Sequence, residues 1–318
     1  MRRSLFLALI LTAPIAAHAQ TTADGVALFE ARRYAEARGA LEAAAKANGK
    51  DARAAYYLGR IALVDGDAGK AEHWLERAVK LDGGKAEYHH WLGRAYSREA
   101  LRAGKLRQMK LAGRIRDEFS TAVSLDPDNV EARFDLLQYY IVVPGIMGGS
   151  EEKAREQAAE IARRNRFRGH LATGAIAERK KDNAGAEREY TAAVAAYPDS
   201  LQGSYTLGTY YARRGDWERA FAVCERLIAE RKDPVGKYYF GRIASMSGQR
   251  LDRGAELLGE YLQRRPDDTD PSLASAHYRL GLIYEKQGKR DLAKAEYATT
   301  VQLDPKQSEA KEGLKRVQ

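Results

Sequence analysis

Apolar residues recur along most of the chain at alternating intervals of four and three positions, as in Ala37, Leu41 and Ala44. This spacing places them on one face of an α-helix. The same stripe returns in three further stretches: Ala71, Leu75 and Ala78; Ala186, Tyr190 and Ala193; and Ala293, Tyr297 and Thr300. A second apolar stripe precedes this one, and a glycine such as Gly66 or Gly215 separates the two. Glycine favours the positive φ of a tight turn, so the pattern predicts pairs of helices joined by short turns.

The helix pairs repeat with a regular period. Leu58-Gly59 and Leu92-Gly93 are 34 positions apart, and so are Gly174 and Gly208. Glycine on the first helix and alanine on the second let two helices approach to about 8–10 Å. Each pair is apolar on two sides and cannot bury both alone. Stacking of successive pairs is therefore expected, which produces a solenoid.

One unit carries a complete sequence motif, made of Leu280-Gly281, Tyr284, Ala293, Tyr297 and Pro305. Trp91-Leu92-Gly93-Tyr96 matches the first half of the same motif. This motif closely resembles the tetratricopeptide repeat (TPR) family, and the resemblance covers residues 20–307 as about eight units. It implies an all-α protein: a right-handed superhelix of about eight helix-turn-helix repeats, closed by a capping helix over residues 308–317.

Two insertions interrupt the period, the first a basic insertion at about 97–118. Tyr96 and Phe119 are 23 residues apart, where a regular unit has 13. From Arg98 to Arg116 there is one acid, Glu99, and the basic side chains are Arg98, Arg102, Lys105, Arg107, Lys110, Arg114 and Arg116. One interpretation is a lengthened helix pair with a solvated basic face. The other is a docking surface for an acidic partner or an anionic lipid.

The second insertion is a loop at about 141–150, which replaces a tight turn. Ser150 followed by Glu151 and Glu152 predicts a helix N-cap with acids in the first turn. Gly148-Gly149 could cradle an anion, although the spacing fits no phosphate-binding motif, and we interpret the segment as a structural loop. Leu137 stands in this unit where other units have glycine, which predicts slightly wider helix packing.

The N-terminus has the order of a cleavable signal peptide over residues 1–19. Arg2 and Arg3 precede an apolar stretch from Leu5 to Ile15, and small residues surround His18. This order predicts export and cleavage after Ala19, with the bacterial periplasm as the favoured compartment. An uncleaved membrane anchor is the alternative. Cleavage would remove two of the 53 Lys+Arg and none of the 44 Asp+Glu, so the net charge would fall from +9 to +7.

Composition and motifs exclude several classes of function. A single cysteine excludes an internal disulfide and a multi-thiolate metal site, and a mean hydropathy of -0.55 excludes a transmembrane bundle. No nucleophile–base, zinc-protease or nucleotide-binding motif is present, so we expect no enzyme, no cofactor and no metal. Cys224 falls in an apolar position and is expected to be buried. The adjacent His89 and His90 should point to different faces of one helix, and most of the histidines are expected to be half-buried.

The resemblance also implies a concave groove lined by two positions of each first helix. We call the glycine of each first helix, such as Gly59 or Gly93, the stripe glycine; Leu137 takes its place in one unit. The residues three positions before it are Tyr56, His90, Phe134, Leu171, Tyr205, Tyr238 and Tyr278. One residue after it stand Arg60, Arg94, Gln138, Ala175, Thr209, Arg242 and Leu282. Tyrosine and arginine dominate binding hot spots, and arginine can hold a carboxylate in a bidentate pair. The alternative is that the tyrosines pack only between repeats.

The sequence therefore predicts a non-enzymatic periplasmic scaffold that binds a peptide or protein segment, of acidic character, in the groove. The alternative is a binder of an anionic membrane surface or polyanion through the basic helix at 98–116. Nucleic acid is not expected, because many acids offset the basic residues and export removes the usual ligand. The oligomeric state is not determined by the sequence.

Overall fold

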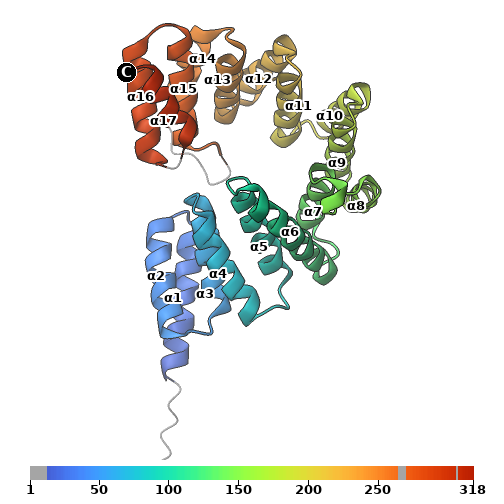
Figure 1. Cartoon of the computed structure of the whole chain (residues 1–318), viewed down its shortest axis with the longest axis vertical. Coiled ribbons are helices and arrows are strands. Elements are labelled where there is room, and N and C mark those ends of the chain that lie inside the picture. Colours follow the sequence, from blue (N-terminus) through green and yellow to red (C-terminus); the bar gives the residue numbers. More distant parts are fainter. Residues whose placement is uncertain (1–12, 264–269, 306) are drawn as a thin grey trace, which may run out of the picture. The chain divides into compact units, whose positions relative to one another are not determined.

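The structure is a computed structural model that describes residues 13–263, 270–305 and 307–318, with side chains described from Thr22 onward. Every regular element in this part of the chain is helical (Figure 1). The chain divides into two compact units, Met1–Asn165 and Arg166–Gln318. We describe each unit by itself.

Unit 1 contains four helix pairs. Their helices are α1 (Ala13–Glu30), α2 (Tyr34–Ala47), α3 (Ala52–Val64), α4 (Ala68–Leu81), α5 (Ala86–Ala100), α6 (Lys105–Leu125), α7 (Val130–Val142) and α8 (Glu151–Arg164), with the 3-10 helix η1 (Gly145–Met147) before α8. Each helix packs against the next one in the chain, and α1 also contacts α3, as α3 contacts α5.

Unit 2 contains four more pairs and a closing helix. Its helices are α9 (Arg166–Arg179), α10 (Asn183–Ala196), α11 (Leu201–Arg213), α12 (Trp217–Arg231), α13 (Pro234–Ser247), α14 (Leu251–Leu262), α15 (Leu273–Lys286), α16 (Arg290–Leu303) and α17 (Ser308–Arg316). The eight pairs and the closing helix within the described residues confirm the predicted all-α repeat fold. The odd-numbered helices α1–α15 are called the first helices from here on.

Close packing within a pair depends on the stripe glycine of the first helix. A β-carbon added to Gly93 would lie 2.5 Å from Cε1 of Phe119, and one added to Gly174 would lie equally close to Tyr190. The predicted turns are also present, because Gly66 and Gly215 have φ of 74° and 73°. Only glycine takes up this conformation without strain.

The basic insertion forms the end of α5, the following turn and an extended α6. Phe119 and Leu75 are equivalent, because each lies against the stripe glycine of its pair. Since α6 begins at Lys105 and α4 at Ala68, α6 has about two more turns before this position than α4 has. The α5–α6 hairpin is therefore longer than its neighbour at the turn end.

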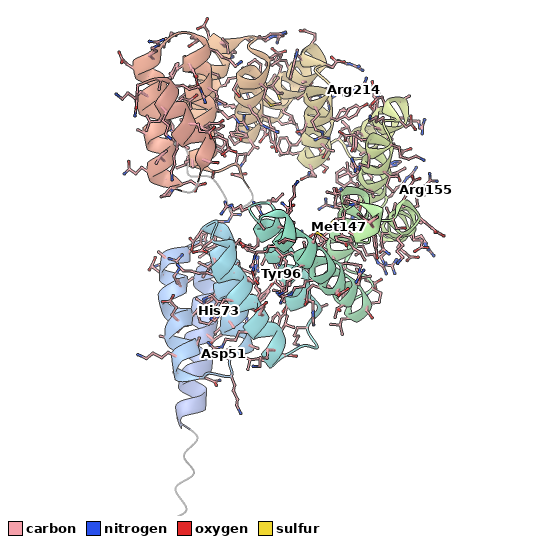
Figure 2. The ribbon with its side chains drawn as sticks, in the orientation of Figure 1. Asp51, His73, Tyr96, Met147, Arg155 and Arg214 are labelled. Carbon is pink, nitrogen blue, oxygen red and sulfur yellow. The ribbon has the colours of Figure 1, made fainter. Side chains whose placement is uncertain are left out.

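The loop insertion is held by its own hydrogen bonds. The Tyr139 hydroxyl donates to the backbone carbonyl of Met147, which is labelled in Figure 2, at 2.7 Å. The amide of Ser150 donates to the carbonyl of Tyr140 at 3.1 Å. The Ser150 side chain then caps α8 by accepting from the amide of Lys153. The predicted N-cap is confirmed.

Residues 1–12 of the expected signal peptide lie outside the described residues. The rest of that segment, including the expected cleavage position after Ala19, lies in α1, so cleavage remains a prediction. Within the described residues, no helix combines the length and apolar character needed to span a bilayer.

Candidate functional site

The most distinctive group on the first helices of unit 1 is an arginine held between two aromatic rings. The guanidinium carbon of Arg60, on α3, lies 4.5 Å from the ring centroid of Phe29 on α1 and 4.4 Å from that of Trp91 on α5. Stacking of successive repeats aligns these helices and so brings the three residues into one row. The rings of Tyr56 and Tyr57 lie further away, at 5.6 Å and 5.7 Å.

The charge of Arg60 has little internal compensation. No carboxylate pairs with it among residues whose side chains are described, and its Nε is buried without a hydrogen-bond partner there. Cation–π contacts contribute about 0.5–2 kcal/mol each, but they do not neutralise the charge. An incoming carboxylate would find a cation whose position is already fixed by the rings.

Arg94 occupies the equivalent position on α5, but unlike Arg60 it has a carboxylate partner. Its Nε donates to Oδ2 of Asp135 at 2.5 Å, and Nε2 of His90 lies 2.8 Å from the same oxygen. Burial alone would raise the pKa of Asp135, but the hydrogen bonds from His90 and Arg94, together with the Arg94 charge, hold that pKa below its usual value. The charge of Arg94 is therefore already compensated within the unit.

Three of the expected groove rings are buried. Tyr56 is 4% exposed and stacks on Tyr88 with centroids 4.8 Å apart, His90 is held by Asp135, and the Tyr238 hydroxyl lies 2.6 Å from Oγ of Ser275. These three rings contact the neighbouring repeat, so a ligand-binding role for them stays a prediction. This outcome matches the alternative in which such rings pack between repeats.

The sequence reasoning missed the neighbouring position, two before the stripe glycine. Tyr57, Trp91 and Tyr239 stand there, and all three are half-buried rather than enclosed. Each of these aromatic residues stands three positions before an arginine of the same helix, and this repeated spacing is visible in the sequence. A helical wheel of the first helices could have found it.

In unit 2, three expected groove residues line one apolar pocket between α11, α12 and α13. They are Tyr205, Thr209 and Arg242, and Tyr239 and Cys224 line the same pocket. Tyr205 stacks on Tyr239 with centroids 4.9 Å apart. Arg242 is half-buried and has no ion pair within the described part of the chain.

The rim of this pocket is fixed through Asp233. The Tyr205 hydroxyl donates to Oδ2 of Asp233 at 2.5 Å, and the same oxygen accepts from the amide of Gly236 in the first turn of α13 at 2.9 Å. Burial and this hydrogen bond raise the pKa of Tyr205 well above its usual value. The ring therefore stays neutral and fixed in place at neutral pH.

The pocket exists because Cys224 is small. Cys224 stands sixteen positions after Gly208, as Leu75 does after Gly59. In that pair a β-carbon on Gly59 would lie 2.5 Å from Leu75, whereas one on Gly208 would meet Val223 at 3.2 Å and no cysteine atom among its three nearest neighbours. The thiol is buried, as predicted, and leaves space that a larger side chain would fill.

The remaining groove candidates are less distinctive. Phe134 and Gln138 are half-buried on α7, Leu171 is buried, and Tyr278 is half-buried beside Arg279. The guanidinium carbon of Arg279 lies 5.4 Å from the Tyr278 ring. Ala175 and Leu282 are half-buried. None of these forms a group comparable to that around Arg60.

Four of the seven basic residues of the insertion are engaged within unit 1. Arg114 donates to Glu76 at 2.5 Å and its guanidinium carbon lies 4.1 Å from the ring of Tyr96 (Figure 2). The other three contacts are Arg107 with Glu72 and Glu99, Arg102 with the carbonyl of Gly66, and Arg116 with Asp117. Arg98, Lys105 and Lys110 are exposed, and no acid pairs with them among the described side chains.

Histidine–glutamate pairs recur across the helix pairs. Nδ1 of His89 lies 2.6 Å from Glu118, and the same contact joins His170 to Glu189 and His277 to Glu296. Each histidine stands four residues before its stripe glycine, a regularity that the sequence reasoning missed. His170 and His277 are half-buried as expected, whereas His89 and His90 are buried and His73 is exposed. No cluster of potential metal ligands occurs within the described residues.

Comparisons with known proteins agree with this architecture. Family models described as tetratricopeptide repeat match residues 22–86, 171–236 and 274–307, more than half of the chain. A tetratricopeptide repeat protein from Parabacteroides merdae is similar, with a TM-score of 0.54 and 14% identity over 94% of this chain and 98% of that one.

Yeast Tom70 is similar with a TM-score of 0.67 and 12% identity, over 98% of this chain but only 65% of that one. A TPR protein of Thermus thermophilus has a TM-score of 0.50 and 18% identity, over 61% of this chain and 98% of that one. At these identities the likeness shows the fold alone. No curated protein sequence matches the chain.

Proposed function

Because the chain belongs to the tetratricopeptide repeat family, whose fold is that of a protein–protein interaction scaffold, we propose that it binds a carboxylate-bearing peptide or protein segment on its first helices. The protein acts without catalysis. It holds its partner through fixed arginines and aromatic rings rather than through a loop that must become ordered. Stiff repeats lose little entropy on binding.

The observation that carries this proposal is the Arg60 group. An arginine that served only stability would be expected to have a carboxylate partner, as Arg94 has in Asp135. Arg60 instead keeps its planar face between Phe29 and Trp91. A carboxylate approaching its edge could form a charge-assisted hydrogen bond, which is worth about 1.5–3 kcal/mol.

Unit 2 supports the same chemistry with a second, separate group. Arg242 lies beside the rings of Tyr205 and Tyr239 at the apolar pocket. An apolar side chain next to an acidic one would suit this surface. The two groups could engage separate parts of one extended partner or act on separate partners.

The proposed site of action is the periplasm of a bacterium. The support is the order of charged, apolar and small residues before Gln20. Export would present the scaffold to envelope or secreted proteins. Fractionation of cells that express the full chain tests this part of the proposal, because a chain of unchanged mass in the cytoplasm would contradict it.

The binding proposal is tested with Arg60→Met, which keeps an apolar stem between the rings and removes the charge. We expect capture of the partner from envelope extract to weaken by about 10- to 150-fold, the equivalent of one lost charge-assisted hydrogen bond. Arg38→Met is the matched control, because Arg38 pairs with Asp65 on the exposed side of α2. Equal loss in both variants, or no loss with Arg60→Met, would show that Arg60 does not hold the partner.

A further inference from the structure

The turn end of the α5–α6 hairpin has apolar side chains where a water-facing surface is expected. Leu101 is 80% exposed, Leu106 is 86% exposed and Met109 is 59% exposed. We call these three residues, with Arg98, Lys105 and Lys110, the hairpin tip. Arg98 lies in the last turn of α5, but none of the six is among the residues proposed above to bind a peptide.

The apolar side chains of the tip face away from the interior of unit 1. Ile115 is buried on the packed side of α6, and Leu106 stands nine positions before it. At about 100° per residue, Leu106 lies about 180° around the helix from Ile115. A β-carbon added to Gly113, seven positions after Leu106, would meet nothing within 4 Å. This side of α6 is therefore open along two turns.

The charges around these side chains are unmatched. Arg98, Lys105 and Lys110 are exposed and have no acid partner among the described side chains. Glu99 is the one acid between Arg98 and Arg116, and its carboxylate already accepts from Arg107 at 3.2 Å. The tip thus combines projecting apolar groups with a local positive charge.

We propose that the hairpin tip docks on an anionic phospholipid membrane surface. Apolar side chains flanked by Lys and Arg are the composition that inserts at a lipid headgroup layer, where the apolar groups enter and the cations contact phosphate. Leu101 and Leu106 are too exposed to line a pocket formed by the protein itself. A lipid layer accepts such projecting groups without a matching concave surface, whereas a protein partner would have to supply one.

Three of the engaged basic residues, Arg102, Arg107 and Arg114, connect the hairpin to other elements of unit 1. Arg114 fixes α6 to α4 through Glu76, and Arg107 joins both α5 and α4 through Glu99 and Glu72. The unmatched charges are therefore presented from a braced hairpin. The basic insertion divides into a structural part and a part available for the membrane.

The first experiment measures co-sedimentation of the full chain with vesicles. We expect binding to vesicles of phosphatidylglycerol and phosphatidylcholine, weak binding to phosphatidylcholine alone, and loss of binding as salt rises. Lys105→Gln with Lys110→Gln should lower the partition coefficient about 30-fold, at about 1 kcal/mol per basic residue. Leu101→Ser with Leu106→Ser should lower it at least about tenfold. Leu303→Ser, at a half-exposed position of α16, is the control and should bind normally.

The second experiment separates the tip from the apolar N-terminal residues, which every variant shares. Leu106→Cys is labelled with an environment-sensitive fluorophore, and the buried Cys224 does not compete for the label. We expect a blue shift on addition of the anionic vesicles, and no shift for the label at Leu303→Cys. Absence of the shift at position 106, unchanged binding of the tip variants, or equal binding to neutral vesicles would overturn the proposal. Both experiments are independent of Arg60, so failure here leaves the peptide-binding proposal intact.

Discussion

Gly59 on α3 lies so close to Leu75 on α4 that a β-carbon on the glycine would stand 2.5 Å from Leu75 Cγ. The contact sets the separation of the two helices, because the missing side chain lets the leucine fill the space. The same relationship holds between Gly281 and Tyr297, at 2.8 Å. Helix propensity favours alanine over glycine by about 1 kcal/mol, so packing alone accounts for glycine at these positions.

The substitution Gly59→Ala should therefore destabilise unit 1. Overpacking costs about 1–3 kcal/mol and outweighs the gain in helix propensity. Gly39→Ala is the matched control, since Gly39 is exposed on α2 and a β-carbon there meets nothing within 4 Å. That variant should be more stable by about 0.5–1 kcal/mol. Urea unfolding followed by circular dichroism measures both, and a stabilised Gly59→Ala would refute the packing argument.

The fold follows from features that the sequence displays directly. Stripe glycines such as Gly59, the apolar residues opposite them and turn glycines such as Gly66 recur at a fixed period, and each is a local requirement of a helix pair. Local requirements can be recognised without knowing which residues meet across the chain. For this reason the all-α repeats and the Ser150 cap were predictable.

The candidate site was only partly predictable, because it depends on contacts between repeats. The sequence predicted Arg60 as a groove residue, but its position between Phe29 and Trp91 depends on how α1 and α5 pack beside α3. Tyr56 was placed on the ligand side, although a change of one position, about 100° around the helix, separates it from Tyr57. A rotation of this size decides whether a side chain faces solvent or the next repeat, but it leaves the helical periodicity that predicts the fold unchanged.

Cys224 should be unreactive in the native protein. Burial raises the pKa of its thiol to about 12, so almost no thiolate exists at pH 8, and thiolate is the reactive form. We expect a thiol reagent such as dithionitrobenzoate to label the chain only as fast as unit 2 opens, and to label it at once in denaturant. Rapid labelling under native conditions would contradict the burial of this residue.

Filling the space beside Cys224 offers a test of the pocket. Cys224→Val adds one carbon-sized group next to the pocket that Gly208 and Tyr239 line. We expect a stability change within about 1.5 kcal/mol, because volume is added where space exists. Ala71→Val adds two carbons at a fully buried position of α4, where overpacking should cost about 1–3 kcal/mol. Thermal unfolding of Cys224→Val and Ala71→Val compares the two sites, and equal costs would argue against a pocket.

His89 should make the stability of unit 1 depend on pH. The hydrogen bond that His89 donates to Glu118 raises the pKa of His89, burial opposes this increase, and the hydrogen bond to the carbonyl of Gly83 adds to it. A raised folded-state pKa gives stabilisation that is complete below the unfolded value of about 6.5 and is lost as pH rises through the folded value. Glu118→Gln should flatten the unfolding free energy over that interval, whereas His73→Gln, at an exposed position, should leave its slope unchanged.

Asp135 should contribute pH dependence of the opposite sign. Its pKa is held below the usual value in spite of burial, because His90 and Arg94 both contact its Oδ2. The stabilisation is therefore present above the unfolded value of about 3.9 and is lost as pH falls through the folded value. Asp135→Asn keeps the shape of the side chain but removes the charge, which leaves Arg94 without its strongest partner.

We expect Asp135→Asn to lower the free energy of unfolding at pH 7 by about 1–3 kcal/mol and to reduce its decline between pH 5 and pH 3. Asp117→Asn is the matched control, because Asp117 is exposed and its pair with Arg116 lies on the surface of α6, where such pairs contribute about 0–1 kcal/mol. Urea titrations at each pH distinguish the variants. If Asp135→Asn were as stable as the control, the pair of Arg94 with Asp135 would contribute little to the free energy of unfolding. The contrast between a compensated Arg94 and an uncompensated Arg60 would then lose its energetic basis.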